Sequence, residues 1–75
     1  MREEILRLLT EEFPEVDFTA SDALVDDEIL DSLTITGIIS TLSMEYGIDI
    51  PYESITAENF NSVDAIAALV EKLKG

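Results

Sequence analysis

The sequence contains no cysteine and no histidine, and these two absences remove several classes of function. Without cysteine, neither disulfides nor thiolate metal sites can reinforce the fold, so the core must be built from apolar side chains. Without histidine, the chain lacks the usual general base and the commonest metal ligand. We therefore expect a protein that is not an enzyme and that has no metal site.

Basic residues are also scarce, since Lys and Arg number 4 against 17 Asp and Glu, which gives a formal net charge of −13. This charge repels the phosphates of nucleic acids and of anionic membranes. We expect no nucleic-acid binding and no membrane insertion, and we expect basic protein surfaces as the natural partners. The hydrophobic content of 47% argues against a disordered acidic tail.

The length of 75 residues fits one small domain, which we place over residues 1–75, and leaves no room for a separate catalytic domain. No apolar run approaches the length of a membrane span. The first four residues lack the basic-then-apolar order of a signal peptide. These features predict a cytoplasmic protein, and we expect it to be a monomer.

The first segment has the pattern of an amphipathic helix, predicted over about Arg2–Glu12. Pro14 ends this helix, because the residue before a proline is pushed out of the helical region. Over Glu15–Leu30, apolar residues are scattered among acids, which predicts a long ordered loop that crosses between two roughly parallel helices. A short helical turn near Ser21–Leu24, capped by its serine, fits this pattern.

The second helix is predicted over about Ser32–Tyr46, with Gly47 as its terminating glycine. One side of this helix is suited to the core, and it consists of Ile35, Ile38, Ile39, Leu42 and Tyr46. A second strip begins beside the first serine and runs down the exposed side, and it consists of Leu33, Gly37, Ser40 and Met44. Apolar residues that the core does not need indicate a docking surface, although single exposed apolar residues are common.

The rest of the chain predicts an extended piece over Ile48–Pro51, then a single helical turn over Thr56–Phe60 capped by its threonine. The last helix is predicted to start at Asn61 or Ser62. Its apolar face consists of Val63, Ile66, Ala67, Leu69, Val70 and Leu73. The predicted fold class is all-α, a small up-down bundle of three main helices and one short helix.

Ser32 stands at the predicted start of the second helix, where the function is expected to lie. A helix start exposes unpaired backbone N–H groups at the positive end of the macrodipole, so a phosphate linked to an oxygen there is favoured. Serine is equally suited to this position as a plain N-cap with no chemistry. The position of Ser32 alone leaves both interpretations open.

The residues Asp31-Ser32-Leu33 resemble the Asp-Ser-Leu signature of acyl carrier proteins, in which the serine carries 4′-phosphopantetheine. The similarity runs along essentially the full chain and includes Ile48–Pro51 after the second helix. This resemblance implies a single carrier domain of four helices. A phosphopantetheinyl transferase would attach the prosthetic group covalently to Ser32, with Asp31 helping to orient metal or transferase, and Leu33 and Met44 would contact partners.

Several residues depart from the pattern of carriers in fatty-acid synthesis, which usually have an acid directly after the motif and acids along the exposed strip of the second helix. This chain has Thr34, Gly37 and Ser43 in that stretch. Leu30 and Asn59–Ser62 are more similar to stand-alone carriers, including D-alanyl and peptidyl carriers, that are loaded by a separate adenylating ligase. The resemblance therefore implies a thioester-bound acyl or aminoacyl group, passed to downstream acyltransferases in fatty-acid or secondary-metabolite biosynthesis.

Three other interpretations fit the residues less well. The acids Asp22, Asp26, Asp27, Glu28 and Asp31 suggest a calcium loop, but their spacing lacks the alternating ligands and central glycine of an EF-hand. An acidic decoy of a nucleic-acid-binding protein fits the composition, yet it leaves the Asp-Ser-Leu motif unexplained. A serine hydrolase is excluded sooner, because no histidine is present to activate the serine.

Overall fold

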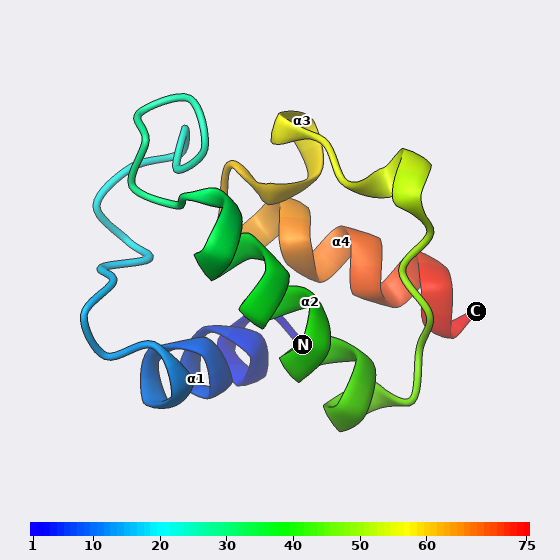
Figure 1. Cartoon of the computed structure of the whole chain (residues 1–75). Helices are drawn as coiled ribbons and strands as arrows, with labels where there is room; N and C mark the ends of the chain where they lie inside the picture. The colour runs from blue at the N-terminus through cyan, green and yellow to red at the C-terminus, as the bar shows by residue number, and fades with distance from the viewer.

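The computed structural model describes all 75 residues and contains four α-helices and no β-strand. These are α1 (Arg2–Glu12), α2 (Ser32–Tyr46), α3 (Ala57–Phe60) and α4 (Val63–Lys74), with a 3-10 turn, η1, over Tyr52–Ser54 (Figure 1). The predicted all-α fold of three main helices and one short helix is confirmed. None of the four helices has the length and apolar character that a membrane span requires.

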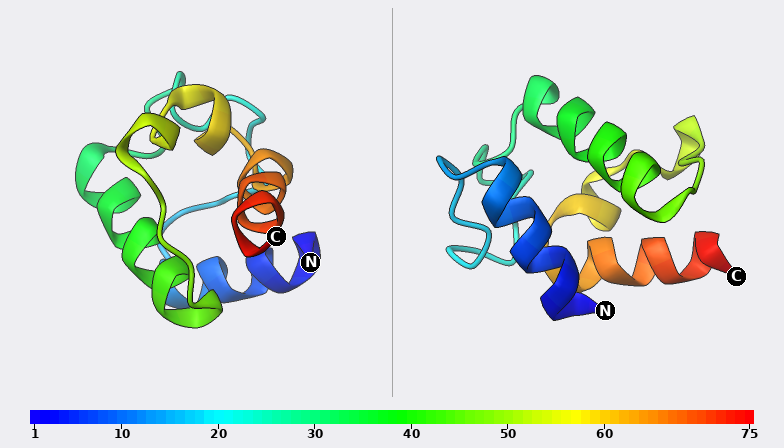
Figure 2. Two further views of the ribbon diagram at one scale, coloured as in Figure 1. Left: turned by 90° about the vertical axis from the view of Figure 1, so that its right-hand side faces the viewer. Right: turned by 90° about the horizontal axis from the view of Figure 1, so that it is seen from below.

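Helix α4 is the element on which the others pack, since it contacts α1, α2 and α3. Helices α2 and α4 run in roughly the same direction, and α1 runs against them (Figures 1 and 2). At one end of the bundle Phe13, just after α1, lies against Gly37 near the start of α2. The expectation that α1 and α2 are parallel is therefore wrong, because the long loop stays at one end of the bundle instead of crossing its length.

Tyr46, the last residue of α2, contacts the start of α1 and the end of α4. Its phenol donates a hydrogen bond to Glu4 Oε1 of α1 at 2.7 Å, and Lys74 Nζ of α4 lies 5.2 Å from the centroid of its ring. Burial, followed by the bond to Glu4, raises the pKa of Tyr46 to about 12. The phenol therefore stays protonated at neutral pH and keeps donating this bond.

The core is entirely apolar and has no buried polar side chain. The long loop contributes Phe18, Leu24 and Leu30 to it, and this burial keeps the loop ordered although it has no helix of its own. The buried residues are Ile5, Leu9, Phe18, Leu24, Leu30, Ile38, Leu42, Ile50, Phe60, Val63, Ile66, Ala67, Leu69 and Val70.

The helix ends mostly follow the sequence signals. Gly47 ends α2 in the left-handed conformation, with φ 62° and ψ 37°, as predicted. Ser62 caps α4, since its Oγ accepts the N–H of Ala65 at 3.0 Å. Thr56 occupies the N-cap position of α3, but the predicted side-chain cap is wrong. The main-chain oxygen of Thr56 accepts the N–H of Asn59 at 3.1 Å instead.

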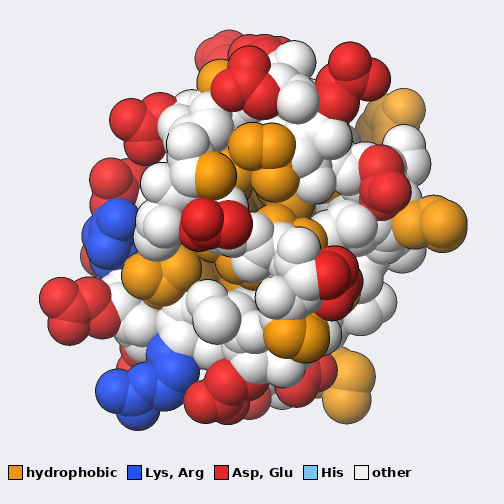
Figure 3. All heavy atoms as spheres, turned by 90° about the vertical axis from the view of Figure 1, so that its left-hand side faces the viewer, with side chains coloured by type: hydrophobic (Ala, Val, Ile, Leu, Met, Phe, Trp, Pro, Cys, Tyr) orange, Lys and Arg blue, Asp and Glu red, His pale blue; other side chains and the backbone are white.

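Carboxylate groups are spread over the face formed by α1 and the long loop, and basic groups show only along one edge of it (Figure 3). One of the few basic residues, Arg2, forms an ion pair with Asp64, which ties the start of α1 to the start of α4. Both side chains are largely exposed, so this pair adds little to stability. The surface therefore remains strongly acidic.

Candidate functional site

Asp31 is the N-cap of α2. Its backbone is extended, with φ −96° and ψ 178°, and its Oδ1 accepts the N–H of Thr34 at 2.7 Å. This hydrogen bond from the Thr34 backbone lowers the pKa of the Asp31 carboxyl, so the cap is ionised at neutral pH. The interpretation of Ser32 as a plain N-cap is therefore wrong, because the aspartate before it already fills that role.

Ser32 is the first residue of α2, and its side chain is exposed to solvent. Its hydroxyl oxygen makes no hydrogen bond with the protein, whereas its main-chain oxygen accepts from Thr36 Oγ1 at 2.8 Å. The first turn of α2 holds no acidic residue, while those of α1 and α4 each do. The hydroxyl is thus free at the positive end of a helix dipole, where a phosphoester is well placed.

The loop before this site forms its turn later than predicted. The expected turn over Ser21–Leu24 is absent, and the chain turns over residues 24–28 instead. The Ser21 hydroxyl accepts the N–H of Ala23 at 2.8 Å and donates to Asp27 Oδ2 at 2.6 Å, so it joins the residues before the turn to the turn itself. Glu28 then closes the turn in the left-handed region, with φ 60°.

Asn61, at the junction of α3 and α4, pins this loop with four hydrogen bonds. Its main-chain oxygen accepts the N–H of Leu24 at 2.8 Å. Its Oδ1 accepts the N–H groups of Val25 and Asp26, at 2.9 and 3.1 Å. Its Nδ2 donates to Asp26 Oδ2 at 3.0 Å. These bonds join positions 35 or more residues apart, and no periodic pattern in the sequence predicts them.

Leu24, which is bonded to Asn61, is in turn hydrogen-bonded to the residues directly before the motif. Its main-chain oxygen accepts the N–H groups of Ile29 and Leu30, at 2.9 and 3.0 Å. The side chains of Leu24 and Leu30 are both buried in the core. The backbone that leads into Asp31 and Ser32 is consequently held by main-chain bonds and by two buried leucines.

The predicted docking strip on α2 is present but interrupted. Leu33 and Met44 are 84% and 87% exposed, the values of side chains that contact almost nothing in the folded chain. Ser40 between them is exposed as well. Gly37 does not belong to this surface, because a Cβ placed there would lie 2.9 Å from the Phe13 ring. The lack of a side chain at Gly37 makes room for that ring.

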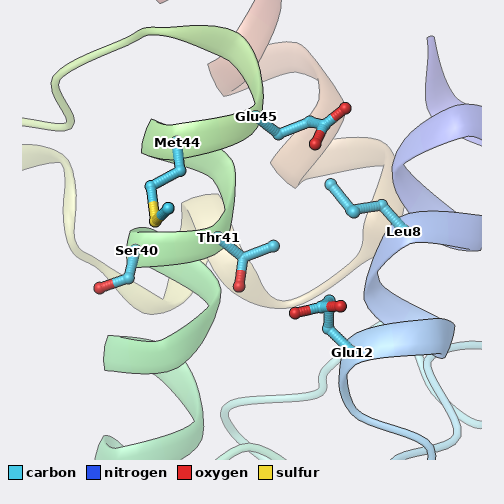
Figure 4. Close-up of a pocket in the computed structure, with 6 residues that line it drawn as sticks. All are labelled: Leu8, Glu12, Ser40, Thr41, Met44 and Glu45. Atoms are coloured by element: carbon cyan, nitrogen blue, oxygen red, sulfur yellow. The ribbon is translucent and has the colours of Figure 1, made fainter.

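A hollow of ≈ 330 Å³ lies between α1 and α2, beside the exposed strip. Thr41 and Glu45 point from α2 toward Leu8 and Glu12 of α1, whereas Met44 lies at the outer rim (Figure 4). Two further exposed apolar residues, Tyr52 at 88% and Ile55 at 38%, lie on or beside η1. The sequence analysis missed these two, since single apolar residues in a polar stretch carry no periodic signal.

The acidic residues of the long loop do not form a metal site. No three acidic side chains come together in an arrangement that holds a metal ion. The Asp27 carboxylate is bonded to Ser21 and that of Asp26 to Asn61, so these acids serve the turn itself. The calcium-loop interpretation has no support in this geometry.

The site thus consists of an exposed serine hydroxyl at the start of a 15-residue helix, next to an ionised capping aspartate. The chain has no histidine that could activate this hydroxyl. A family model described as a phosphopantetheine attachment site matches residues 2–70. A comparison with curated proteins gave no match.

Proposed function

Because the chain belongs to the phosphopantetheine-attachment family over residues 2–70, we propose that Ser32 is the residue that carries the prosthetic group. Members of this family are non-catalytic carriers that hold 4′-phosphopantetheine covalently. The observation that carries the assignment is the exposed Ser32 hydroxyl, left free because Asp31 caps the helix. The residues around it fit a phosphoester, since the first turn of α2 contains no acidic residue and Asp31 takes only the N–H of Thr34.

Attachment under this proposal is a displacement by the serine oxygen. Ser32 Oγ forms a new bond to the phosphorus next to the pantetheine of coenzyme A. The bond from that phosphorus to the bridging oxygen breaks, and adenosine 3′,5′-bisphosphate leaves. The hydroxyl proton goes to a base of the transferase, because this chain has no histidine to take it. Once attached, the group supplies the terminal thiol that holds an acyl chain as a thioester, a sulfur that the cysteine-free chain itself lacks.

Asp31 has a second proposed role at this step. One carboxylate oxygen caps the helix, and the lowered pKa keeps the group charged. The Asp31 side chain is exposed next to Ser32, so its second oxygen is available to a cation brought by the transferase. Asp31 would therefore orient the transferase or its metal as well as the serine.

Covalent modification is tested by intact mass. The apo-protein is incubated with coenzyme A and a broad-specificity phosphopantetheinyl transferase, and one phosphopantetheine increment is expected. Ser32→Ala should abolish it, whereas Ser40→Ala, which alters another exposed serine of α2, should not. An increment that survives Ser32→Ala, or none on the wild type, would contradict the proposal. The absence of any increment is what an acidic decoy predicts.

The exposed surface of α2 favours a stand-alone carrier loaded by a separate adenylating ligase. Glu45 is the only acidic residue within α2, so this helix offers little charge for steering an enzyme. Leu33 and Met44 offer nearly fully exposed apolar side chains, the kind that anchor a partner once it has bound. We propose that these two residues contact the ligase and downstream acyltransferases, and that the cargo is an acyl or aminoacyl group. Under this proposal the carrier acts in the cytoplasm as a monomer.

Partner contact is tested at Met44. Met44→Ala should slow loading by the cognate ligase by about tenfold, equivalent to about 1.4 kcal/mol. Tyr52→Ala is the matched control, since Tyr52 is equally exposed but lies on η1 and should leave loading unchanged. Enzymes of fatty-acid elongation should accept the loaded protein poorly. Efficient elongation on the wild type, with indifference to Met44→Ala, would indicate an ordinary fatty-acid carrier instead.

A further inference from the structure

Asn61 forms hydrogen bonds with the loop that leads into Ser32, although in the sequence it comes after α2 and the loop comes before it. We propose that Asn61 is a positioning residue for the modification of Ser32, acting through the backbone of residues 24–30. This inference rests on the proposed role of Ser32. It concerns how the serine is presented to the transferase, and Asn61 itself touches no reacting atom.

The first step is the dual use of the Asn61 side chain. A single Oδ1 accepts from the backbone N–H groups of Val25 and Asp26, and Nδ2 donates to the carboxylate of Asp26. The amide therefore acts as acceptor and donor at once toward one short stretch of loop. Asparagine supplies both functions on a short side chain, whereas an aspartate offers acceptors only.

The second step carries this hold to the motif. The main-chain oxygen of Asn61 accepts the N–H of Leu24, and the main-chain oxygen of Leu24 accepts the N–H groups of Ile29 and Leu30. Only Asp31 separates Leu30 from Ser32. The buried side chains of Leu24 and Leu30 keep this backbone against the core. Displacement of Leu24 would thus be transmitted to Ser32 through two hydrogen bonds and two covalently joined residues.

The functional consequence follows from the geometry that a displacement reaction requires. The serine oxygen must approach the phosphorus in line with the leaving oxygen, and a misplacement of about 1 Å can cost on the order of a hundredfold in rate. A loosened loop would leave the exposed residues farther along α2, such as Met44, in place while Ser32 samples unproductive positions. Loss of the Asn61 bonds should therefore lower kcat of the transferase and leave KM for the apo-protein nearly unchanged.

The test compares the same substitution at two neighbouring asparagines. Asn61→Asp keeps the acceptor oxygen but replaces the donor with an oxygen that faces the Asp26 carboxylate at close range. Asn59→Asp makes the same change in charge and also removes a donor, since Asn59 Nδ2 bonds to the main-chain oxygen of Ser54 at 2.8 Å. Asn59 is half-buried like Asn61 but has no side-chain bond to the loop before Ser32.

We expect kcat for phosphopantetheine transfer to fall about tenfold in Asn61→Asp and by less than about twofold in Asn59→Asp. Adding Asp26→Asn to Asn61→Asp exchanges donor and acceptor across the same contact and should restore kcat to within about threefold of the wild type. Amide hydrogen exchange should quicken at Ile29 and Leu30 in Asn61→Asp and stay unchanged at Val70 in the core of α4. Asn61→Ala, which keeps the main-chain acceptor, is measured beside it in case the aspartate variant does not fold.

Equal loss of kcat in the two asparagine variants, no recovery in the exchanged pair, or a change confined to KM would overturn the proposal. Global unfolding of both Asn61 variants would also overturn it, because Asn61 would then be required for the fold and not specifically for the site. Absence of modification on the wild-type protein is a separate outcome, since it refutes the role of Ser32 itself.

Discussion

Helices α2 and α4 both begin beside a serine, yet the two serines have different surroundings. Ser62 is the N-cap of α4, and its oxygen accepts the N–H of Ala65. Ser32 follows the N-cap of α2, because the Asp31 carboxylate accepts the corresponding N–H of Thr34. A shift of one residue relative to the cap thus decides whether a serine oxygen satisfies the helix or remains available for chemistry.

The residues after the two serines differ in the same way. Val63 is 3% exposed and packs in the core, whereas Leu33 is 84% exposed. At the start of α4, the serine oxygen is therefore used to cap the helix and the next side chain is buried in the core. The start of α2 keeps its hydroxyl and its first apolar side chain on the outside, which is what an attachment site with a docking contact requires.

The largest effect is expected when Asp31 and Ser32, at the start of α2, are exchanged. Asp31→Ser combined with Ser32→Asp places the hydroxyl in the cap, as in α4, where the helix N–H groups occupy it. The protein should remain helical by circular dichroism, and phosphopantetheine transfer should fall by more than about a hundredfold. Ser62→Ala serves as the control, which should cost about 1 kcal/mol of stability and leave transfer intact. Full transfer to the exchanged protein would show that the offset from the cap is irrelevant.

A smaller effect is expected when the residue after each serine is truncated. Val63→Ala removes a buried side chain and should lower the free energy of unfolding by roughly 2 kcal/mol, within the range for a buried valine. Leu33→Ala removes an exposed side chain and should change it by less than about 0.5 kcal/mol. Urea denaturation of both variants measures the difference. Similar losses at the two positions would mean that Leu33 packs in the fold.

The smallest effect distinguishes the two caps by their response to acid. The pKa of Asp31 is lowered in the folded state, so its stabilising contribution is present above the carboxyl's ordinary pKa of 3.8. It is lost as the pH falls through the lowered value. Ser62 does not titrate, so the cap of α4 should persist. Asp31→Asn, which still caps, should remove this part of the pH dependence in urea titrations between about pH 5 and pH 2. An unchanged acid response would contradict the assignment of the shifted group.

Much of the fold follows from local signals in the sequence. The bounds of α1 and α2 agree with the apolar periodicity and with the stops at Pro14 and Gly47, because these depend on neighbouring residues only. The motif in the sequence also singles out Ser32, which we propose as the attachment residue. Its free hydroxyl was not predictable, because either Asp31 or Ser32 satisfies the sequence rule for a cap and only the backbone geometry decides between them.

The errors arise where distant parts of the chain meet. The bonds of Asn61 to the loop join residues 35 or more positions apart, and they place the turn over residues 24–28, after the predicted one. Gly37 was assigned to the exposed strip because of its place on the helical wheel, while the ring of Phe13 covers it. The direction of α1 relative to α2 likewise depends on where the loop is anchored. None of these contacts has a signature in local composition or periodicity.

The anchoring of the loop by Asn61 also has a consequence for the order in which the molecule is built. The residues that support the segment before Ser32 lie downstream of the motif, at Asn61 and in α4, which contacts every other helix. Such long-range contacts form only after the intervening chain has been closed into a loop. A growing polypeptide that ends before Asn61 contains the complete Asp-Ser-Leu motif but lacks its support. Under the proposed role of Ser32, the site therefore gains its full support only after the chain has been synthesised through Asn61 and α4.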